Sequence, residues 1–532
     1  MIGGFRQNMT WLHTWAGLVF CWILYFMFVT GTLGYLDLEI DRWMEETPPS
    51  VGAAPLEQST NMAMARLQSE AEGAERWMIF PPDGRESPNL GIFWSMPRVE
   101  GSEEPIQRGN EQLDSYTGEP IAEPRRDTGG GQVLYRMHYL LHYFPGQSGY
   151  RLVGLITILM FVGMITGIVV HKKIFREFFT FRPGKGQRSW LDAHNLFSVS
   201  SLPFQLMITY SGLIFTVGLW MPMIGLASYG FDTKMAANLA NELIGEVKVE
   251  RTGTPGPLMN PMELVPAAEA EWGADEVSYF EILNPGDQDS RIVLHREAGI
   301  LTRLGGRMVF DGATGEHLET MPPTKLPVLT FAIAMLGLHE GTFAGPFLRW
   351  LYVLSGILGT AMIATGAVHW TSKRRKKAEE GADGFGFRLV ECLNIGTIVG
   401  LPVGIAAFFL ANRILPVEME TRADWEIHIM FLTWLACLIY PAIRGRQHSW
   451  RDLSWLAAAA YAAVPVVNLA TSEMHLGNTI AAGDWVLAGF DLTCLATAAV
   501  FAGVAVYLGK DTRKSTREAT IGAAEHIPLG SS

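Results

Sequence analysis

Long uncharged apolar runs are the feature that most restricts how this chain can fold. A helix needs roughly 20 such residues to cross about 30 Å of hydrocarbon. Eight runs approach that length, at residues 15–36, 152–170, 196–220, 351–368, 392–412, 427–443, 453–471 and 492–509. Three of the last four contain a proline, which membrane helices tolerate. We therefore predict an α-helical integral membrane protein with about eight transmembrane helices.

Basic residues mark one side of these predicted helices. They cluster after the second, fourth, sixth and eighth runs, as in "SKRRKK" at residues 372–377. By the positive-inside rule these connections are cytoplasmic, so both termini are cytoplasmic and the two long connections are external. The external connections hold much of the acidic excess behind the net charge of −12, which argues against a nucleic-acid partner. The predicted membrane helices are in contact with the lipid bilayer.

The predicted organisation divides the chain into alternating membrane and extramembrane parts. They are helix 1 (1–36), an external domain (37–147), helix 2 (148–171), a basic loop (172–193), helix 3 (194–220), a second external domain (221–346), helix 4 (347–370), a second basic loop (371–390), four additional helices (391–510) and a cytoplasmic tail (511–532). We expect the first helix to be retained, because no small-residue cleavage site follows it. All four cysteines fall in apolar runs, and their spacing predicts no disulfide framework or metal motif.

The first 377 residues contain an internal duplication. The sequence "DSYTGE" at Asp114 recurs as "DGATGE" at Asp311, an offset of 197 residues, and His142 and His339 differ by 197 as well. The offset is 198 between His171 and His369, and 181 between His13 and His194. Near-constant offsets across a loop and a helix indicate a repeated unit of helix, external domain and helix. The last four predicted helices lie outside the repeat.

Each external connection is predicted to form a small α+β domain. Residues 55–71 and 261–272 have a helical pattern, and short alternating stretches such as "RWMIF", "LGIFWSM", "VSYFEIL" and "RIVLH" indicate strands. The two Thr-Gly-Glu sequences suit turns between strands, because Gly118 and Gly315 can adopt positive φ. We interpret them as turns that determine the fold and not as ligand sites.

The duplicated histidines carry the functional prediction. A histidine in a membrane helix is costly to bury and indicates function by default, although an interfacial imidazole is the alternative for any single one. Two repeat-related imidazoles can supply the two axial ligands of one haem iron, while copper and zinc also accept imidazole. Four candidates lie at the predicted cytoplasmic helix ends and two on the external side: His13, His171, His194, His369, and then His142 and His339. His138 is a second-rank external candidate on the same helical face as His142.

The separation of these histidines raises a geometric problem. A continuous helix from His142 to His171 would place them roughly 43 Å apart at about 1.5 Å per residue, which is too far for direct electron transfer. Pro145, Gly146 and Gly149 lie between them and favour a break in the helix. We predict either such a break or a further electron carrier.

Six motifs resemble those of the PepSY-associated transmembrane proteins of bacterial inner membranes. They are "WLHTWAGL", the two TGE-containing domains, "TGIVVHKK", "RSWLDAHNLF" and "TGAVHW", and they cover roughly residues 5–377. Within that family the sequence is most similar to ferric-siderophore reductases of the ferrioxamine and pyoverdine type. The resemblance implies two PepSY-like periplasmic domains, b-type haem in two or more copies with axial ligands among these histidines, and reduction of a ferric siderophore on the periplasmic side.

The remaining expectations concern the electron donor and the haem propionates. No predicted cytoplasmic segment is long enough for a flavin or nicotinamide domain, so a membrane quinol or a separate cytoplasmic reductase would supply electrons. Arg151 and Arg349 occupy equivalent external helix ends and either bind haem propionates or extend to the interface. Two other classes of function stay open: a haem-free regulatory protein that binds partners through its external domains, and a transporter of a siderophore or metal.

Overall fold

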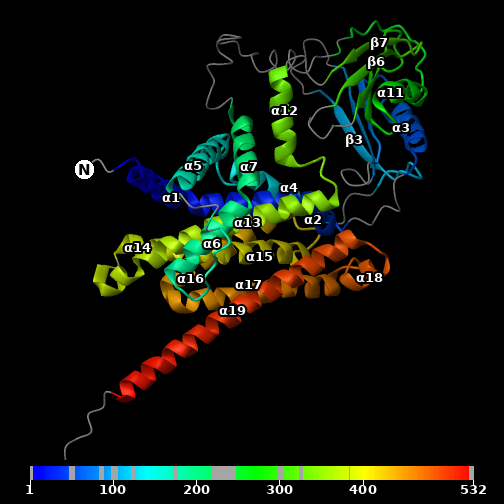
Figure 1. Ribbon diagram of the computed structural model, residues 1–532. Helices are drawn as coiled ribbons and strands as arrows, with labels where there is room; N and C mark the ends of the chain where they lie inside the picture. The colour runs from blue at the N-terminus through cyan, green and yellow to red at the C-terminus, as the bar shows by residue number, and fades with distance from the viewer. Residues whose placement is uncertain are drawn as a thin grey trace, which may run out of the picture. The chain divides into compact units, whose positions relative to one another are not determined.

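The structure is a computed structural model that describes residues 4–525, with gaps at 47–53, 83–88, 98–105, 122–125, 172–175, 177, 218–246, 248, 297–304, 323–326 and 383. It consists of two compact units (Figure 1). The helical unit comprises Met1–Pro48, Pro124–Leu206 and Trp350–Ser532, and the sheet unit comprises Pro49–Glu123 and Met207–Arg349.

The helical unit contains most of the long apolar helices. Its helices are α1 (Phe5–Gly34), α2 (Asp37–Glu45), α4 (Gly130–Leu140), α5 (Ser148–Val170), α6 (Gln187–Ser200), α13 (Pro346–Lys377), η2 (Ala378–Ala382), α14 (Phe385–Ile398), α15 (Gly400–Ile414), α16 (Arg422–Arg444), α17 (Arg446–Thr471), α18 (Leu476–Ala481) and α19 (Trp485–Glu525). α1 packs against α4 and α5, while α15 packs against α16 and α17, and α17 against α19. Helix α7 (Leu202–Phe215) runs from this unit into the sheet unit.

Seven helices within the described residues are long and apolar enough to cross a membrane, which confirms a multi-pass membrane protein but not the predicted count of eight. The seven segments are Phe5–Gly34, Ser148–Val170, Pro346–Gly381, Phe385–Ile414, Arg422–Arg444, His448–Thr471 and Trp485–Lys510. The predicted third helix, residues 194–220, is divided instead. Helix α6 ends at Ser200 and α7 begins at Leu202. The last three residues of the predicted third helix, 218–220, lie outside the described residues. Pro441 and Pro465 lie inside α16 and α17, as the tolerance of membrane helices for proline allows.

The predicted break between His142 and His171 is present. Helix α4 ends at Leu140, Leu141 adopts a positive φ of 53°, and α5 begins only at Ser148. A Cβ atom on Gly149 would lie 1.7 Å from the carbonyl oxygen of Leu140, so only glycine permits this close return of the chain. As a result α4 lies against α1, and it belongs to the helical unit although the sequence assigned it to an external domain.

The sheet unit contains seven antiparallel strands from both long connections. The first connection supplies α3 (Leu56–Glu70), β1 (Arg76–Phe80), β2 (Leu90–Ser95) and β3 (Arg108–Leu113). The second supplies η1 (Pro261–Leu264), α11 (Val265–Trp272), β4 (Val277–Leu283), β5 (Arg291–Arg296), β6 (Arg307–Asp311), β7 (His317–Met321) and, after the sheet, α12 (Pro327–Glu340). The strand order is β3-β2-β1-β4-β5-β6-β7.

The helices and strands predicted in these connections occur at the expected residues, but they do not form two separate sheets. Strand β1 pairs with β4, with Trp77 opposite Ile282 and Ile79 opposite Phe280. The physical reason is that β1 and β4 would otherwise each expose an unpaired edge. One buried core under α3 and α11 runs across the junction and includes Ile79, Phe280 and Ile282.

The two TGE sequences form the same turn. The carboxylate of Asp114 accepts hydrogen bonds from the Thr117 N–H and hydroxyl at 2.8 and 3.1 Å, and Asp311 accepts the matching pair from Thr314 at 3.0 Å each. Gly118 and Gly315 have φ of 72° and 74°. In each turn the Asp carboxylate accepts from the Thr of the same turn, and Asp311 also accepts from Arg291 of β5, which agrees with the interpretation as fold-determining turns.

Candidate functional site

His13 and His194 come together from the two halves of the repeat. His13 lies on α1 and His194 on α6, and the centres of their rings are 6.3 Å apart. An imidazole nitrogen binds a transition metal at about 2 Å and lies roughly 1 Å from its ring centre, so two imidazoles on opposite sides of one metal have ring centres about 6 Å apart. The pair therefore has the separation that a shared metal atom requires.

The surroundings of both rings leave the outer nitrogen of each free to bind a metal. Nδ1 of His13 lies 2.9 Å from the carbonyl oxygen of Gly163, and Nδ1 of His194 lies 2.8 Å from that of Met362. A carbonyl oxygen only accepts, so each Nδ1 carries the proton and each Nε2 keeps its lone pair. Metal-binding histidines usually donate their other N–H in this way, which fixes the tautomer and the ring orientation.

The repeat explains why both contacts have the same form. Gly163 and Met362 are 199 residues apart, and so are Gly167 and Gly366 of the two "TG" sequences. A Cβ atom on Gly167 would lie 3.2 Å from the His13 ring, and one on Gly366 would lie 3.1 Å from the His194 ring. In each half, the glycine four residues after the accepting carbonyl makes room for the imidazole.

His138, the second-rank external candidate, has the same arrangement. Its Nδ1 lies 2.7 Å from the carbonyl oxygen of Met27, and Gly31 follows four residues later. A Cβ atom on Gly31 would lie 2.6 Å from Nδ1 of His138, so this glycine is required. The signal that could have revealed His138 is the "TG" at Thr30–Gly31, the third such sequence in an apolar run.

His339 contacts the matching part of the second half. Its Nδ1 lies 2.8 Å from the hydroxyl oxygen of Ser211, which itself donates to the carbonyl of Met207 and therefore accepts from the imidazole. Ser211 and Gly212 follow Thr30 and Gly31 by 181 residues, the offset that also relates His194 to His13. By its local contacts, the counterpart of His339 is thus His138, whereas the sequence offset had paired it with His142.

His142 lies in the turn after α4, in different surroundings. Its ring stacks on Phe431 at 6.0 Å and contacts Tyr143 at 4.7 Å. The Tyr143 hydroxyl is 2.6 Å from Nδ1 of His428 on α16. Burial, followed by the nearby His428, lowers the pKa of His142, so a neutral imidazole is favoured there.

His171 and His369 lie close enough to His194 to interact with it electrostatically. His171 follows the last residue of α5, where its N–H donates to the Gly167 carbonyl at 3.1 Å. Nδ1 of His369 lies 3.3 Å from the carbonyl oxygen of Gln187. His13, His171 and His369 therefore all lie near His194, and the ring centres of His13 and His194 are 6.3 Å apart.

Arg151 and Arg349 occupy corresponding places at the start of α5 and α13. Arg151 is exposed in the first turn of its helix. Arg349 is partly buried, and its guanidinium donates to the carbonyl of Ala344 at 2.8 Å. Both can reach beyond their helix ends, and their role toward propionates stays a prediction.

Comparison with known proteins decides the family. A profile described as the PepSY-associated TM region matches residues 10–373, a stretch that contains every candidate histidine. The chain belongs to the PepSY-associated transmembrane family. The similar proteins include the uncharacterized protein PA4219 of Pseudomonas aeruginosa, which is 24% identical over 356 residues, covering 64% of this chain and 86% of that protein. Helices α14 to α19 lie outside the region that defines the PepSY-associated family.

Proposed function

We propose that this protein carries electrons across the bacterial inner membrane through b-type haem held by paired histidines, and that it reduces ferric siderophores on the periplasmic side. The observation that supports this most strongly is the pair of imidazoles of His13 and His194, 6.3 Å apart, each with its Nδ1 bound to a carbonyl of a neighbouring helix. Leaving the second nitrogen of each imidazole without a ligand inside a membrane bundle would be costly.

The donor set fits haem better than the common alternatives. Among the described residues, no three His, Cys, Asp or Glu side chains converge on one metal position. Structural zinc sites usually have four protein ligands, whereas a bis-histidine haem needs two from the protein. We assign His13 and His194 to one such site and place His138 and His339 as ligand candidates for further haem.

The chain's own residues have a defined task in this proposal. Haem b would supply reversible one-electron chemistry. The carbonyls of Gly163 and Met362 hold the imidazoles in one tautomer and orientation, and the two glycines of the "TG" sequences let the helices approach closely. Burial and hydrogen bonding of the ligands are the means by which a protein sets a haem potential.

Reduction would release the iron from its carrier. Siderophores hold Fe(III) through hard oxygen donors, and these hold Fe(II) less well. One electron added to the ferric complex therefore frees the metal for uptake. The electron would come from a membrane quinol or a cytoplasmic reductase, because the chain carries no nucleotide-binding motif in its sequence.

The proposal is tested by replacing one imidazole at a time and following electron delivery. Anaerobic, dithionite-reduced protein is mixed with ferrioxamine, and Fe(II) is trapped with ferrozine. We expect His13→Ala and His194→Ala to lower bound haem and Fe(II) release together. His317→Ala, which changes an exposed histidine on β7, is the matched control and should leave both unchanged. Full haem content in both variants would refute the ligand assignment, and haem without Fe(II) release would refute the substrate.

A further inference from the structure

A buried ionic cluster joins the first repeat to the additional C-terminal helices. It contains three arginines and three carboxylates, all 6% exposed or less: Arg126, Arg413, Arg422, Glu46, Glu426 and Asp491. Arg126 and Glu46 come from the segments next to α4 and α2, and the other four from α15, α16 and α19. The opposite charges are equal in number, so the cluster is neutral and is not by itself an ion-binding site. Sequence reasoning missed it because its contacts join remote parts of the chain, such as Arg126 and the Asn412 carbonyl, which are 286 positions apart.

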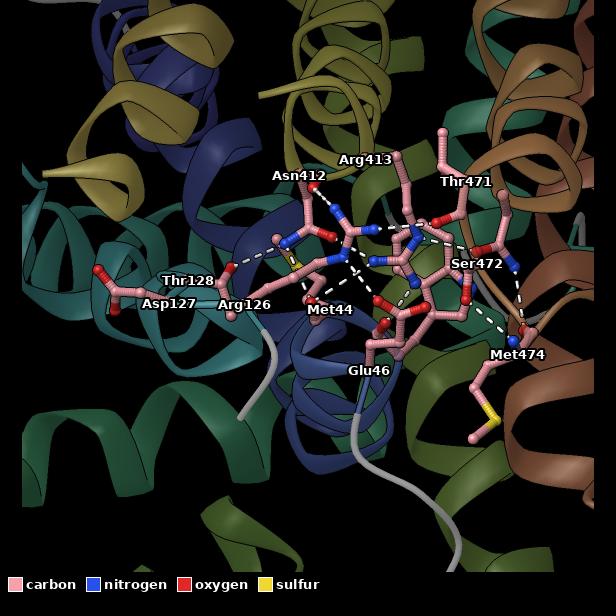
Figure 2. Close-up of polar contacts among 12 residues, drawn as sticks. Met44, Glu46, Arg126, Asp127, Thr128, Asn412, Arg413, Thr471, Ser472 and Met474 are labelled. Carbon is pink, nitrogen blue, oxygen red and sulfur yellow. Dashed lines mark hydrogen bonds and ion pairs between the residues drawn. The ribbon is translucent and has the colours of Figure 1, made fainter. Parts of the chain in front are cut away.

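The cluster binds the ends of several helices at once. Arg126 donates to Glu46 at 2.9 Å, to the Asn412 carbonyl at 3.1 Å and to the Thr471 carbonyl at 3.2 Å (Figure 2). Those carbonyls lie in the last turns of α15 and α17, where no intrahelical donor remains for them. Arg413 donates to Asn468 at 2.8 Å, and its guanidinium lies 3.7 Å from the centre of the Trp43 ring. The C-terminal helices are therefore tied to α2 by directed bonds and not by apolar contact alone.

One carboxylate of the cluster caps the start of α4. Glu426 accepts from the Thr128 hydroxyl at 2.5 Å and from the Gly129 N–H at 3.2 Å. Arg422 holds Glu426 at 2.6 Å and donates to the Asp127 carbonyl at 2.7 Å. A carboxylate at a helix N-terminus is favourable because it meets free N–H groups and the positive end of the helix dipole.

The "GGG" sequence at residues 129–131 allows α4 to begin this close to α2. Asp41 of α2 accepts from the Gly131 N–H at 2.7 Å. A Cβ atom on Gly130, whose φ is +60°, would lie 1.9 Å from Asp41, and one on Gly131 would lie 2.1 Å from the Asp37 carbonyl. The first turn of α4 is thus held by a carboxylate from α16 on one side and by α2 on the other.

Helix α4 carries His138. Eight residues separate Gly130 from His138, so the tied end is about 12 Å from the imidazole at about 1.5 Å per residue. A short helix packed against α1 moves as one body, and a change at its first turn reaches the bond between His138 and the Met27 carbonyl. We propose that the C-terminal helices, which lie outside the family region, serve to position α4, with Glu426 as the positioning residue for His138. The expected effect on the haem rests on the proposed haem function, whereas the positioning of α4 by Glu426 does not depend on it.

The test compares two buried glutamates that are each paired with arginine. Glu391 of α14 is 7% exposed and bonds Arg375 at 3.0 Å and Arg446 at 2.8 Å, neither of which belongs to α4. Hydrogen exchange of the full-length protein in detergent is measured for wild type, Glu426→Gln and Glu391→Gln. We expect exchange in residues 129–141 to become about ten-fold faster or more in Glu426→Gln and to stay at the wild-type rate in Glu391→Gln. The midpoint potential and ferric EPR spectrum of the haem should shift in the first variant only.

A double variant separates positioning from stability. Arg422→Met with Glu426→Leu removes both charges, which usually restores stability to a core that has lost an ion pair. We expect the melting temperature to recover while α4 still exchanges fast, because Thr128 and Gly129 have lost their acceptor. If Glu426→Gln does not fold, Thr128→Val removes one bond to the same carboxylate and gives the same readout.

Each outcome has one meaning. Wild-type exchange across α4 in Glu426→Gln and in Thr128→Val would overturn the inference, as would recovery of both stability and α4 protection in the double variant. A wild-type protein that binds no haem would refute the proposed function, while the exchange measurement would still decide whether Glu426 positions α4.

Discussion

At the residue scale, the feature that recurs is a histidine whose Nδ1 is bound to a backbone carbonyl, with a glycine four residues beyond that carbonyl. His13, His194 and His138 share it. The sequence identified the first two from the duplication. It could not rank His138 above His142, because the offset along the chain does not show that the turn after α4 in the first half is longer than the one after α12.

This difference gives a direct test of His138 as a proposed haem ligand. We expect His138→Ala to abolish one haem per protein, because its Nδ1 is held by the Met27 carbonyl as those of His13 and His194 are held by theirs. His142→Ala, four residues away, should keep the haem and lose only contacts with Phe431 and Tyr143. A pyridine haemochrome assay on both variants measures the stoichiometry. Haem loss in His142→Ala alone would reverse the assignment.

Asp41 provides a pH-dependent prediction. Burial, followed by the charge of Glu45, raises the pKa of Asp41 to about 7. A raised folded-state pKa means that Asp41 contributes stability fully below its unfolded pKa near 3.9, and that this contribution is lost as pH rises through about 7. In Asp41→Asn the side chain stays neutral and can still accept from Gly131. The variant's melting temperature should therefore exceed that of wild type by an amount that grows from pH 5 to pH 7.5 and then levels off. A difference that does not change with pH would contradict this.

At the scale of elements, the strands of both long connections form one sheet. The sequence located β1, β2, β4 and β5 well, because alternation of apolar residues is a local signal. It could not predict that β1 pairs with β4, since the pairing of edge strands depends on contacts about 200 residues apart. For the same reason the sequence did not predict the ionic cluster, in which residues that are close in space come from remote parts of the chain.

The joined sheet predicts one cooperative transition. Phe280 lies fully buried at the β1–β4 junction, and Phe280→Ala should lower the free energy of unfolding by about 3–5 kcal/mol. Hydrogen exchange should then speed up in β1 to β3 as well as in β5 to β7. Leu318→Ala, on an exposed side chain of β7, should change stability by no more than about 0.5 kcal/mol. Faster exchange confined to the strands of the second connection would indicate two independent domains.

At the scale of the whole molecule, the chain is a multi-pass protein of the PepSY-associated transmembrane family with a duplicated first part and an additional C-terminal bundle. The number of apolar helices was nearly predictable, because hydrophobic length is read directly from the sequence. The division of the predicted third helix into α6 and α7 was marked only by Pro203 in the first turn of α7, a residue that membrane helices also tolerate in their interior. The sequence did not predict a role for the C-terminal helices, and the role inferred above rests on the contacts that tie them to α2 and α4.

The measurement that tests the central claim most directly is the visible absorption spectrum of the detergent-purified protein, oxidised and then reduced with dithionite. The account predicts the sharp reduced bands of a low-spin b-type haem, with at least one haem per chain by pyridine haemochrome assay, and reoxidation on adding a ferric hydroxamate siderophore. A colourless protein after expression with ample haem would contradict it, because the carbonyl-bound histidine pairs would then have a purpose other than holding iron.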